Sequence, residues 1–109
     1  MKRVLVYGTL QPGGPNEHVM NAIGGEWHAA MVRGEPPESG WGASQGYPRL
    51  RLDTRGEPVL GQIFASANLA ANWGAMDAFE GEQYTRVLTD AALEDGTHMS
   101  TYVYVLCDV

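Results

Sequence analysis

The sequence predicts a single α+β domain over residues 1–109, built from short strands and two helices. A chain of 109 residues has the length of one domain. Fourteen Gly and six Pro residues indicate frequent turns, which favour short strands over long helices. The apolar patterning places strands at residues 2–7, 26–32, 49–53, 59–65, 84–91 and 100–107, and helices at 16–23 and 66–81.

The elements of the first half differ in how clearly the sequence marks them. Residues 2–7 are apolar at successive positions, which is typical of a strand in the middle of a sheet. Asn16 is a good N-cap residue for the short helix that follows it. Residues 26–32 form a weaker strand candidate. Residues 34–48 have the composition of a long loop, and long loops in small domains are often functional.

The second half shows clearer turn signals. We expect an edge strand at 49–53, because Pro48 precedes it and two arginines lie along it. Gly61 within strand 59–65 indicates a bulge or a close backbone contact. Asp95-Gly96 predicts a hairpin turn between the last two strands.

Charge and cysteine content exclude several classes of protein. The net charge is −6, and residues 57–109 contain a single basic residue, Arg86, so we expect no nucleic-acid partner. The only cysteine, Cys107, excludes an internal disulfide and fits a reducing compartment. The first apolar run is shorter than a signal-peptide core, and no later run has the length of a membrane span. We therefore expect a cytoplasmic protein without a membrane partner.

The opening strand stops abruptly at Gly8 and leads into a loop rich in Gly and Pro. Backbone N–H groups that leave a strand at a glycine have no ladder partner and suit an anion. Residues 8–10 are therefore a candidate carboxylate or phosphate site, although a simple strand-turn-helix connection has the same composition. Gly14-Pro15 stands where a P-loop needs Lys and Ser/Thr, which excludes nucleotide phosphate binding.

Glu80 occupies an unusual position in the predicted helix 66–81. Leu69, Trp73 and Met76 form an apolar stripe, and Glu80 falls in the middle of it. Burial and the helix dipole should raise its pKa above the usual value of about 4.3, which suits proton transfer near neutral pH. Two alternatives remain: the helix ends early and Glu80 reaches solvent, or Glu80 pairs with Arg86.

The order and spacing of several short motifs resemble the gamma-glutamylcyclotransferase-like family across nearly the whole chain. Its members begin with Tyr-Gly-[Ser/Thr]-Leu, a Gly-containing loop and an Asn, here Tyr7-Gly8-Thr9-Leu10, Gly13 and Asn16. A later helix ends in Glu-Gly and is followed by Tyr-x-Arg, here Glu80-Gly81 and Tyr84-Thr85-Arg86. Gly46-Tyr47-Pro48, the strand with Gly61 and the final Tyr102-Val103-Tyr104 follow the same order.

The resemblance implies a small mixed β-barrel of about five to six strands, flanked by two or more helices. It also implies a pocket in which Tyr7, Gly8, Thr9 and Leu10 bind a gamma-glutamyl group while Glu80 acts as the base. Family members often have extra residues between Glu-Gly and Tyr, so Glu82 is a possible substitute base. Tyr84 is expected to line the pocket, and Arg86 to position Glu80 or to meet a substrate carboxylate.

The implied reaction is release of 5-oxoproline from a gamma-glutamyl amine or amino acid by intramolecular aminolysis. It requires no cofactor, and the three histidines have no metal-ligand spacing. The shortened segment after Glu80 is also compatible with lost activity, in which case the pocket would be a silent binding module for a small carboxylate. A structural domain without a ligand is the third alternative. The leaving amine and the oligomeric state are not specified by the sequence.

Overall fold

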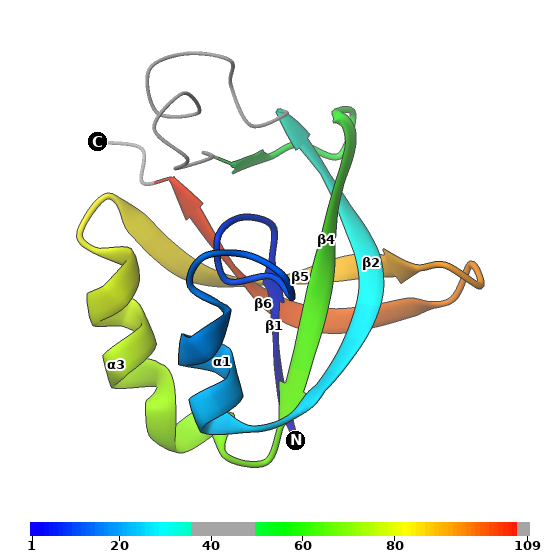
Figure 1. The fold of residues 1–109 in the computed structure, drawn as a ribbon. Helices are drawn as coiled ribbons and strands as arrows, with labels where there is room; N and C mark the ends of the chain where they lie inside the picture. The colour runs from blue at the N-terminus through cyan, green and yellow to red at the C-terminus, as the bar shows by residue number, and fades with distance from the viewer. Residues whose placement is uncertain (36–49, 107–109) are drawn as a thin grey trace.

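The computed structural model describes residues 1–35 and 50–106, which form six strands and two helices (Figure 1). Their bounds are β1 (Lys2–Val6), α1 (Glu17–Ile23), β2 (Glu26–Glu35), β3 (Arg51–Leu52), β4 (Glu57–Ser66), α3 (Leu69–Glu80), β5 (Tyr84–Leu93) and β6 (His98–Leu106). Most of the predicted loop at 34–48, with Gly46-Tyr47-Pro48, lies outside the described residues, as does Cys107.

Five of these strands close into a barrel. The sheet order is β3-β2-β4-β1-β6-β5, and β2 also pairs with β5 through Ala30–Leu93 and Met31–Ala92. β1 and β6 run parallel, whereas the other neighbours run antiparallel. The prediction of a small mixed barrel with flanking helices is therefore confirmed. β1 lies between β4 and β6, as its apolar residues on both faces predict.

Alternate residues of β1 serve two hydrophobic clusters. Val4 and Val6 pack with Met20 of α1 and with Leu69 and Met76 of α3. Both helices therefore cover the same side of the barrel (Figure 1). Leu5, which points the other way, belongs to a second cluster with residues of all the other strands of the barrel, namely Ala30, Val32, Val59, Ile63, Ala91 and Val103. This second cluster is the barrel interior.

Several predicted boundaries differ from the observed ones. β2 extends to Glu35 because its antiparallel ladder with β4 continues as far as Gly34–Glu57. The edge strand is only Arg51–Leu52. The long helix begins at Leu69, because Ser66 still belongs to β4, where its buried hydroxyl donates to the Gly24 carbonyl at 2.6 Å. The predicted turn at Asp95-Gly96 connects β5 and β6.

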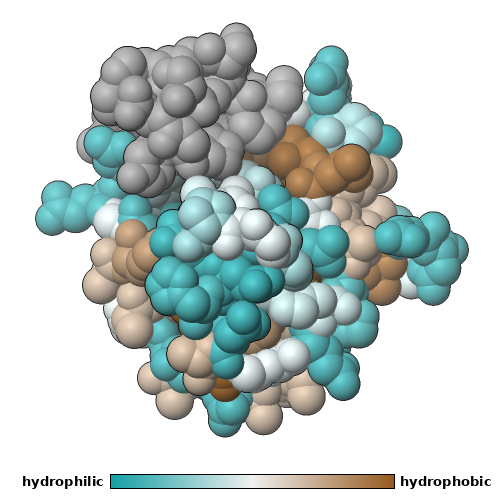
Figure 2. All heavy atoms as spheres, in the orientation of Figure 1, coloured by the Kyte–Doolittle hydropathy of each residue, from teal (hydrophilic) through white to brown (hydrophobic). Residues whose placement is uncertain are grey.

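Hydrophilic side chains cover much of the face that carries the helices, and apolar ones gather near the ends of β2 and β4 beside β3 (Figure 2). Neither helix within the described residues is long and apolar enough to cross a membrane.

Candidate active site

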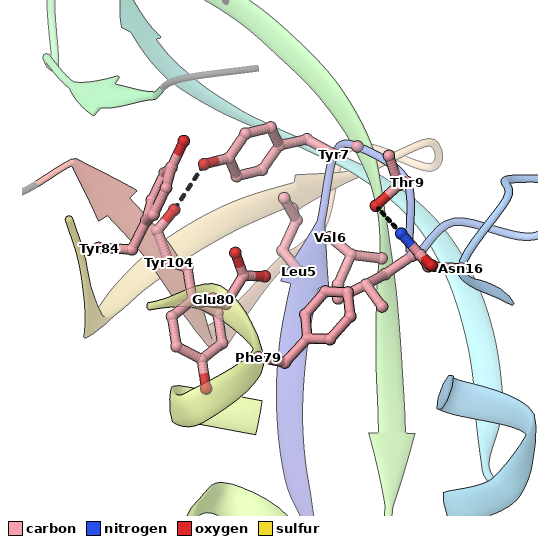
Figure 3. Close-up of a pocket in the computed structure, with 11 residues that line it drawn as sticks. Leu5, Val6, Tyr7, Thr9, Asn16, Phe79, Glu80, Tyr84 and Tyr104 are labelled. Carbon is pink, nitrogen blue, oxygen red and sulfur yellow. Dashed lines mark hydrogen bonds between the residues drawn. The ribbon is translucent and has the colours of Figure 1, made fainter. Parts of the chain in front are cut away.

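A cavity of about 380 Å³ lies at the end of β1 (Figure 3). This volume is in the range of small-molecule sites. Its lining comes from β1 and the loop after it, the end of α3, and the strands β5 and β6: Leu5, Val6, Tyr7, Gly8, Thr9, Leu10, Asn16, Phe79, Glu80, Tyr84 and Tyr104. The barrel thus brings residues 7–10 next to Glu80, although they are about 70 residues apart in the sequence.

The loop after β1 is closed by Asn16. The backbone N–H of Asn16 donates to the Thr9 carbonyl at 2.9 Å, and its side-chain amide donates to the Thr9 hydroxyl at 2.9 Å. Asn16 is the N-cap residue of α1, as predicted, but its side-chain amide is engaged with Thr9 and makes no capping hydrogen bond. A Cβ at Gly14 would lie 2.4 Å from the Thr9 carbonyl oxygen, so only glycine fits this closure.

This closed loop leaves backbone donors beside the cavity. Within residues 1–35 and 50–106, the N–H groups of Gly8, Thr9 and Leu10 donate no hydrogen bond to a protein acceptor. All three residues line the cavity. A carboxylate or an oxyanion is the ligand that such backbone donors favour.

Glu80 is the last residue of α3, and its carboxylate points into the cavity (Figure 3). Gly81, at φ +90°, ends the helix in a conformation that L side chains rarely adopt. Burial raises the pKa of Glu80 to about 6, which is the predicted direction. Among the described residues, Glu80 has no ion-pair partner to offset this burial.

Two tyrosines stand across the cavity from Glu80. The Tyr7 hydroxyl donates to the Tyr104 carbonyl at 2.7 Å, and the Tyr84 ring lies beside that hydroxyl (Figure 3). Burial raises the pKa of Tyr7 well above its ordinary value, and the nearby Tyr84 and Glu80 raise it further. Tyr7 therefore remains protonated near neutral pH, with its proton directed at Tyr104 rather than at a ligand.

Arg86 and Glu82 lie outside the cavity lining. The Arg86 guanidinium stacks on the Trp73 ring at 4.1 Å, and its Nη1 lies 3.4 Å from Asp77 Oδ1. The alternative in which Arg86 pairs with Glu80 is therefore replaced by a pair with Asp77. Glu82 is exposed beyond the end of α3. The structure thus unites Tyr7, Gly8, Thr9, Leu10, Tyr84 and Glu80, and places Arg86 and Glu82 elsewhere.

Five lining residues were not among the predicted site residues: Leu5 and Val6 of β1, Asn16, Phe79 and Tyr104. Asn16 and Tyr104 both lie in motifs that carry the family resemblance, so their position in those motifs was the available signal. Phe79 is 45% exposed at the cavity. Its only sequence signal is that it precedes Glu80.

The family model described as gamma-glutamyl cyclotransferase, AIG2-like, matches residues 4–109. The chain belongs to the AIG2-like gamma-glutamyl cyclotransferase family. This membership confirms the resemblance that the motifs indicated.

Solved structures of AIG2-like and gamma-glutamyl cyclotransferase proteins have the same fold. A mouse AIG2-like protein is 25% identical, with a TM-score of 0.72 over 98% of this chain and 78% of its own. A gamma-glutamyl cyclotransferase is 14% identical, with a TM-score of 0.72 over 98% of this chain and 67% of its own. A protein from Arabidopsis thaliana is 20% identical, with a TM-score of 0.73 over 96% of this chain and 61% of its own. No curated protein matches the sequence significantly.

Proposed function

We propose that this AIG2-like protein is a cofactor-independent cyclotransferase that releases 5-oxoproline from a gamma-glutamyl amine or amino acid. The observation that carries the proposal is the shared cavity. It holds a glutamate of raised pKa together with the N–H groups of Gly8, Thr9 and Leu10, which donate to no acceptor in the described part of the chain. A base and a set of anion-binding donors are the two things that intramolecular aminolysis of a glutamyl amide needs.

Glu80 is the proposed base. With a pKa of about 6 it is mostly ionised at pH 7, so it can accept a proton from the α-ammonium of the substrate. The freed nitrogen attacks the γ-carbonyl carbon, and a C–N bond forms that closes the five-membered lactam. The bond from the γ-carbon to the leaving amine then breaks. Glu80 passes this proton, and then the second proton that the attacking nitrogen loses, to the leaving amine. The products are therefore 5-oxoproline and the amine as its ammonium ion, Glu80 is again a carboxylate, and no water is consumed.

The loop after β1 holds the anionic parts of the substrate in this proposal. The N–H groups from Gly8 to Leu10 donate to the α-carboxylate and to the oxyanion that develops on the γ-carbonyl. Tyr7 and Tyr84 contribute ring surface to the same cavity. Holding the glutamyl chain folded brings its own amine to the carbonyl, which replaces a two-molecule encounter by an intramolecular step.

Release of 5-oxoproline from a panel of gamma-glutamyl amines and amino acids tests the proposal. For a turned-over substrate, we expect Glu80→Gln to lower kcat by about 10²- to 10⁴-fold, because the base is lost while the shape is kept. Glu82→Gln is the matched control, since Glu82 is exposed and lies outside the cavity. A Glu80→Gln variant with intact turnover would exclude Glu80 as the base, and loss of turnover in Glu82→Gln would assign the role to Glu82.

A silent binding module for a small carboxylate is the second candidate. The N–H groups of residues 8–10 beside the cavity favour it, because they would bind a carboxylate whether or not Glu80 moves a proton. Thermal protection by 5-oxoproline or glutamate, without turnover of any compound in the panel, would establish this function in place of the enzymatic one.

A further inference from the structure

Tyr104 of β6 connects the two walls of the cavity. Its hydroxyl donates to Asp77 Oδ1 on α3 at 2.6 Å. Its backbone carbonyl accepts the hydrogen bond from the Tyr7 hydroxyl at 2.7 Å. One residue therefore contacts both the helix that carries Glu80 and the loop that carries the backbone donors.

The contact with Asp77 lies close to Glu80 along the helix. Asp77 precedes Glu80 by three residues, which places the two side chains about one turn apart on neighbouring parts of the helix surface. Glu80 itself is the final residue of α3, and chain direction changes at Gly81 directly after it. The last turn of a helix frays most easily, so a fixed point at Asp77 restrains the position of Glu80.

Arg86 supports this contact from β5. Arg86 and Tyr104 are paired neighbours in the β5–β6 ladder. Arg86 Nη1 approaches Asp77 Oδ1 to 3.4 Å and is buried with no hydrogen-bond partner among the described residues, so its charge faces the same carboxylate that Tyr104 binds. Stacking on Trp73, which also belongs to α3, holds the guanidinium in place.

We propose that Tyr104 and Asp77 form a latch that fixes Glu80 at a set distance from the loop of residues 8–10, with Arg86 as its support. The proposal rests on the proposed function of Glu80 as the base. Tyr104 and Asp77 are positioning residues that act through the end of α3. Tyr104 serves as a stable donor because burial, and then the bond to Asp77, raise the pKa of its hydroxyl above the ordinary value.

Tyr104→Phe is the main test, because it removes the hydroxyl but keeps the ring and the carbonyl that Tyr7 binds. We expect kcat to fall by about 10- to 100-fold, as small misplacements of catalytic groups do, with KM changed by less than about twofold. Asp90→Ala is the matched control, since Asp90 bonds to His98 across the same two strands but lies outside the cavity. We expect it to leave kcat unchanged.

Substitutions of Asp77 distinguish loss of the hydrogen bond between Tyr104 and Asp77 from a general loss of stability. Asp77→Asn keeps an oxygen acceptor for the Tyr104 hydroxyl, so we expect it to retain most of kcat, whereas Asp77→Ala should lose as much as Tyr104→Phe. The double variant Asp77→Ala/Tyr104→Phe should be no worse than the poorer single variant, because both remove one interaction. Equal losses from Asp77→Asn and Asp77→Ala, or additive losses in the double variant, would overturn the proposal.

A readout that needs no turnover distinguishes failure of the latch from failure of the proposed function. NMR titration of the Glu80 side-chain carbonyl in unliganded protein gives its pKa directly. In Tyr104→Phe we expect this pKa to fall from about 6 towards 4.5, because a released helix end exposes the carboxylate. The substitution keeps Asp77 and Arg86 beside α3, and it keeps Tyr7 and Tyr84, which face Glu80 in the cavity. An unchanged Glu80 pKa would refute the latch, whatever the assay shows.

Discussion

At the scale of single residues, the unusual feature is the half-buried carboxylate of Glu80, which has no ion-pair partner within residues 1–35 and 50–106. Arg86 is the basic residue nearest to Glu80 in the sequence, yet the Arg86 guanidinium pairs with Asp77. No ion pair within the described part of the chain offsets the burial of Glu80, and burial raises its pKa to about 6. An ion pair with Arg86 would have lowered this pKa and made Glu80 a weaker base. Because Arg86 pairs with Asp77 instead, Glu80 keeps its raised pKa.

The raised pKa makes the stability of the protein depend on pH in a defined direction. A carboxyl group whose pKa is higher in the folded state binds its proton more tightly there. The stability that this contributes is fully present below about pH 4.5 and is lost as the pH rises through about 6. Because Gln does not ionise, we expect Glu80→Gln to be more stable than the parent protein at pH 8, and the advantage to shrink below pH 5.

Thermal melting of both proteins at pH 4 and pH 8 measures this effect. Glu82→Gln serves as the control, because Glu82 is exposed and lies only two residues after Glu80, so the variant also removes one negative charge from this region. A difference between Glu80→Gln and the parent that is the same at both pH values would show that burial of Glu80 carries no penalty.

At the scale of elements, the site is held by a closed loop on one side and a helix end on the other. Asn16 makes two hydrogen bonds to Thr9 across the loop, and Gly14 lets the chain pass close to the Thr9 carbonyl. On the opposite side, α3 presents Glu80 from its last turn. Both elements pack on β1 in one cluster, which contains Val4 and Val6 of β1, Leu10 of the loop, and Leu69 and Met76 of α3, so packing and site geometry are coupled.

Two glycines in these elements should respond to alanine in opposite ways. A Cβ at Gly14 meets the Thr9 carbonyl at 2.4 Å, so we expect Gly14→Ala to destabilise the protein by about 1–3 kcal/mol. It should also weaken binding of 5-oxoproline, because the loop must shift. Gly74 lies inside α3 with no atom within 4 Å of an added Cβ, so Gly74→Ala should stabilise by about 0.5–1 kcal/mol.

Urea denaturation of both variants, with 5-oxoproline binding measured in parallel, checks the pair. Gly74→Ala is the matched control for the substitution itself. A Gly14→Ala variant as stable as the parent would mean that the loop is free to relax around Thr9.

At the scale of the whole molecule, the barrel positions the residues of both the core and the candidate site. β2 and β5 complete the ring through two pairs, and the cluster of Leu5, Val32, Ile63 and Val103 fills the interior. In this barrel β6 pairs with β1, which sets Tyr104 next to Tyr7. The candidate site is therefore a consequence of how the strands of the barrel pair, not of any one segment.

Two residues of β4 test this description of the core. Ile63 is fully buried in the barrel interior, so we expect Ile63→Ala to lower the free energy of unfolding by about 2–5 kcal/mol. Leu60 is 76% exposed on the same strand, and Leu60→Ala should change that energy by less than about 0.5 kcal/mol. Chemical denaturation measures both, and a large effect of Leu60→Ala would indicate that this position is covered in solution.

Much of the fold follows from local patterns in the sequence. Apolar residues on both faces of residues 2–7 predicted a central strand, and the Asp95-Gly96 turn predicted the last hairpin, because strand faces and tight turns depend on nearby residues. The helical period likewise placed Glu80 on the buried side of α3. The boundaries were less accurate, since a strand ends where its ladder partner ends, as β2 does opposite β4.

By itself, the sequence determined the family, the mixed barrel and the glutamate that faces the core. Only the tertiary structure decided the contacts within the site around that glutamate. Arg86 pairs with Asp77, and Asn16 donates to Thr9 across the loop. Tyr104 is hydrogen-bonded to Asp77 of the helix and to Tyr7 at the start of the loop. The physical reason is that periodicity specifies which face of an element is buried, whereas contact partners depend on how elements far apart in the chain are packed. Tyr104 lies 97 residues from Tyr7, and the pairing of β1 with β6 in the barrel makes them neighbours.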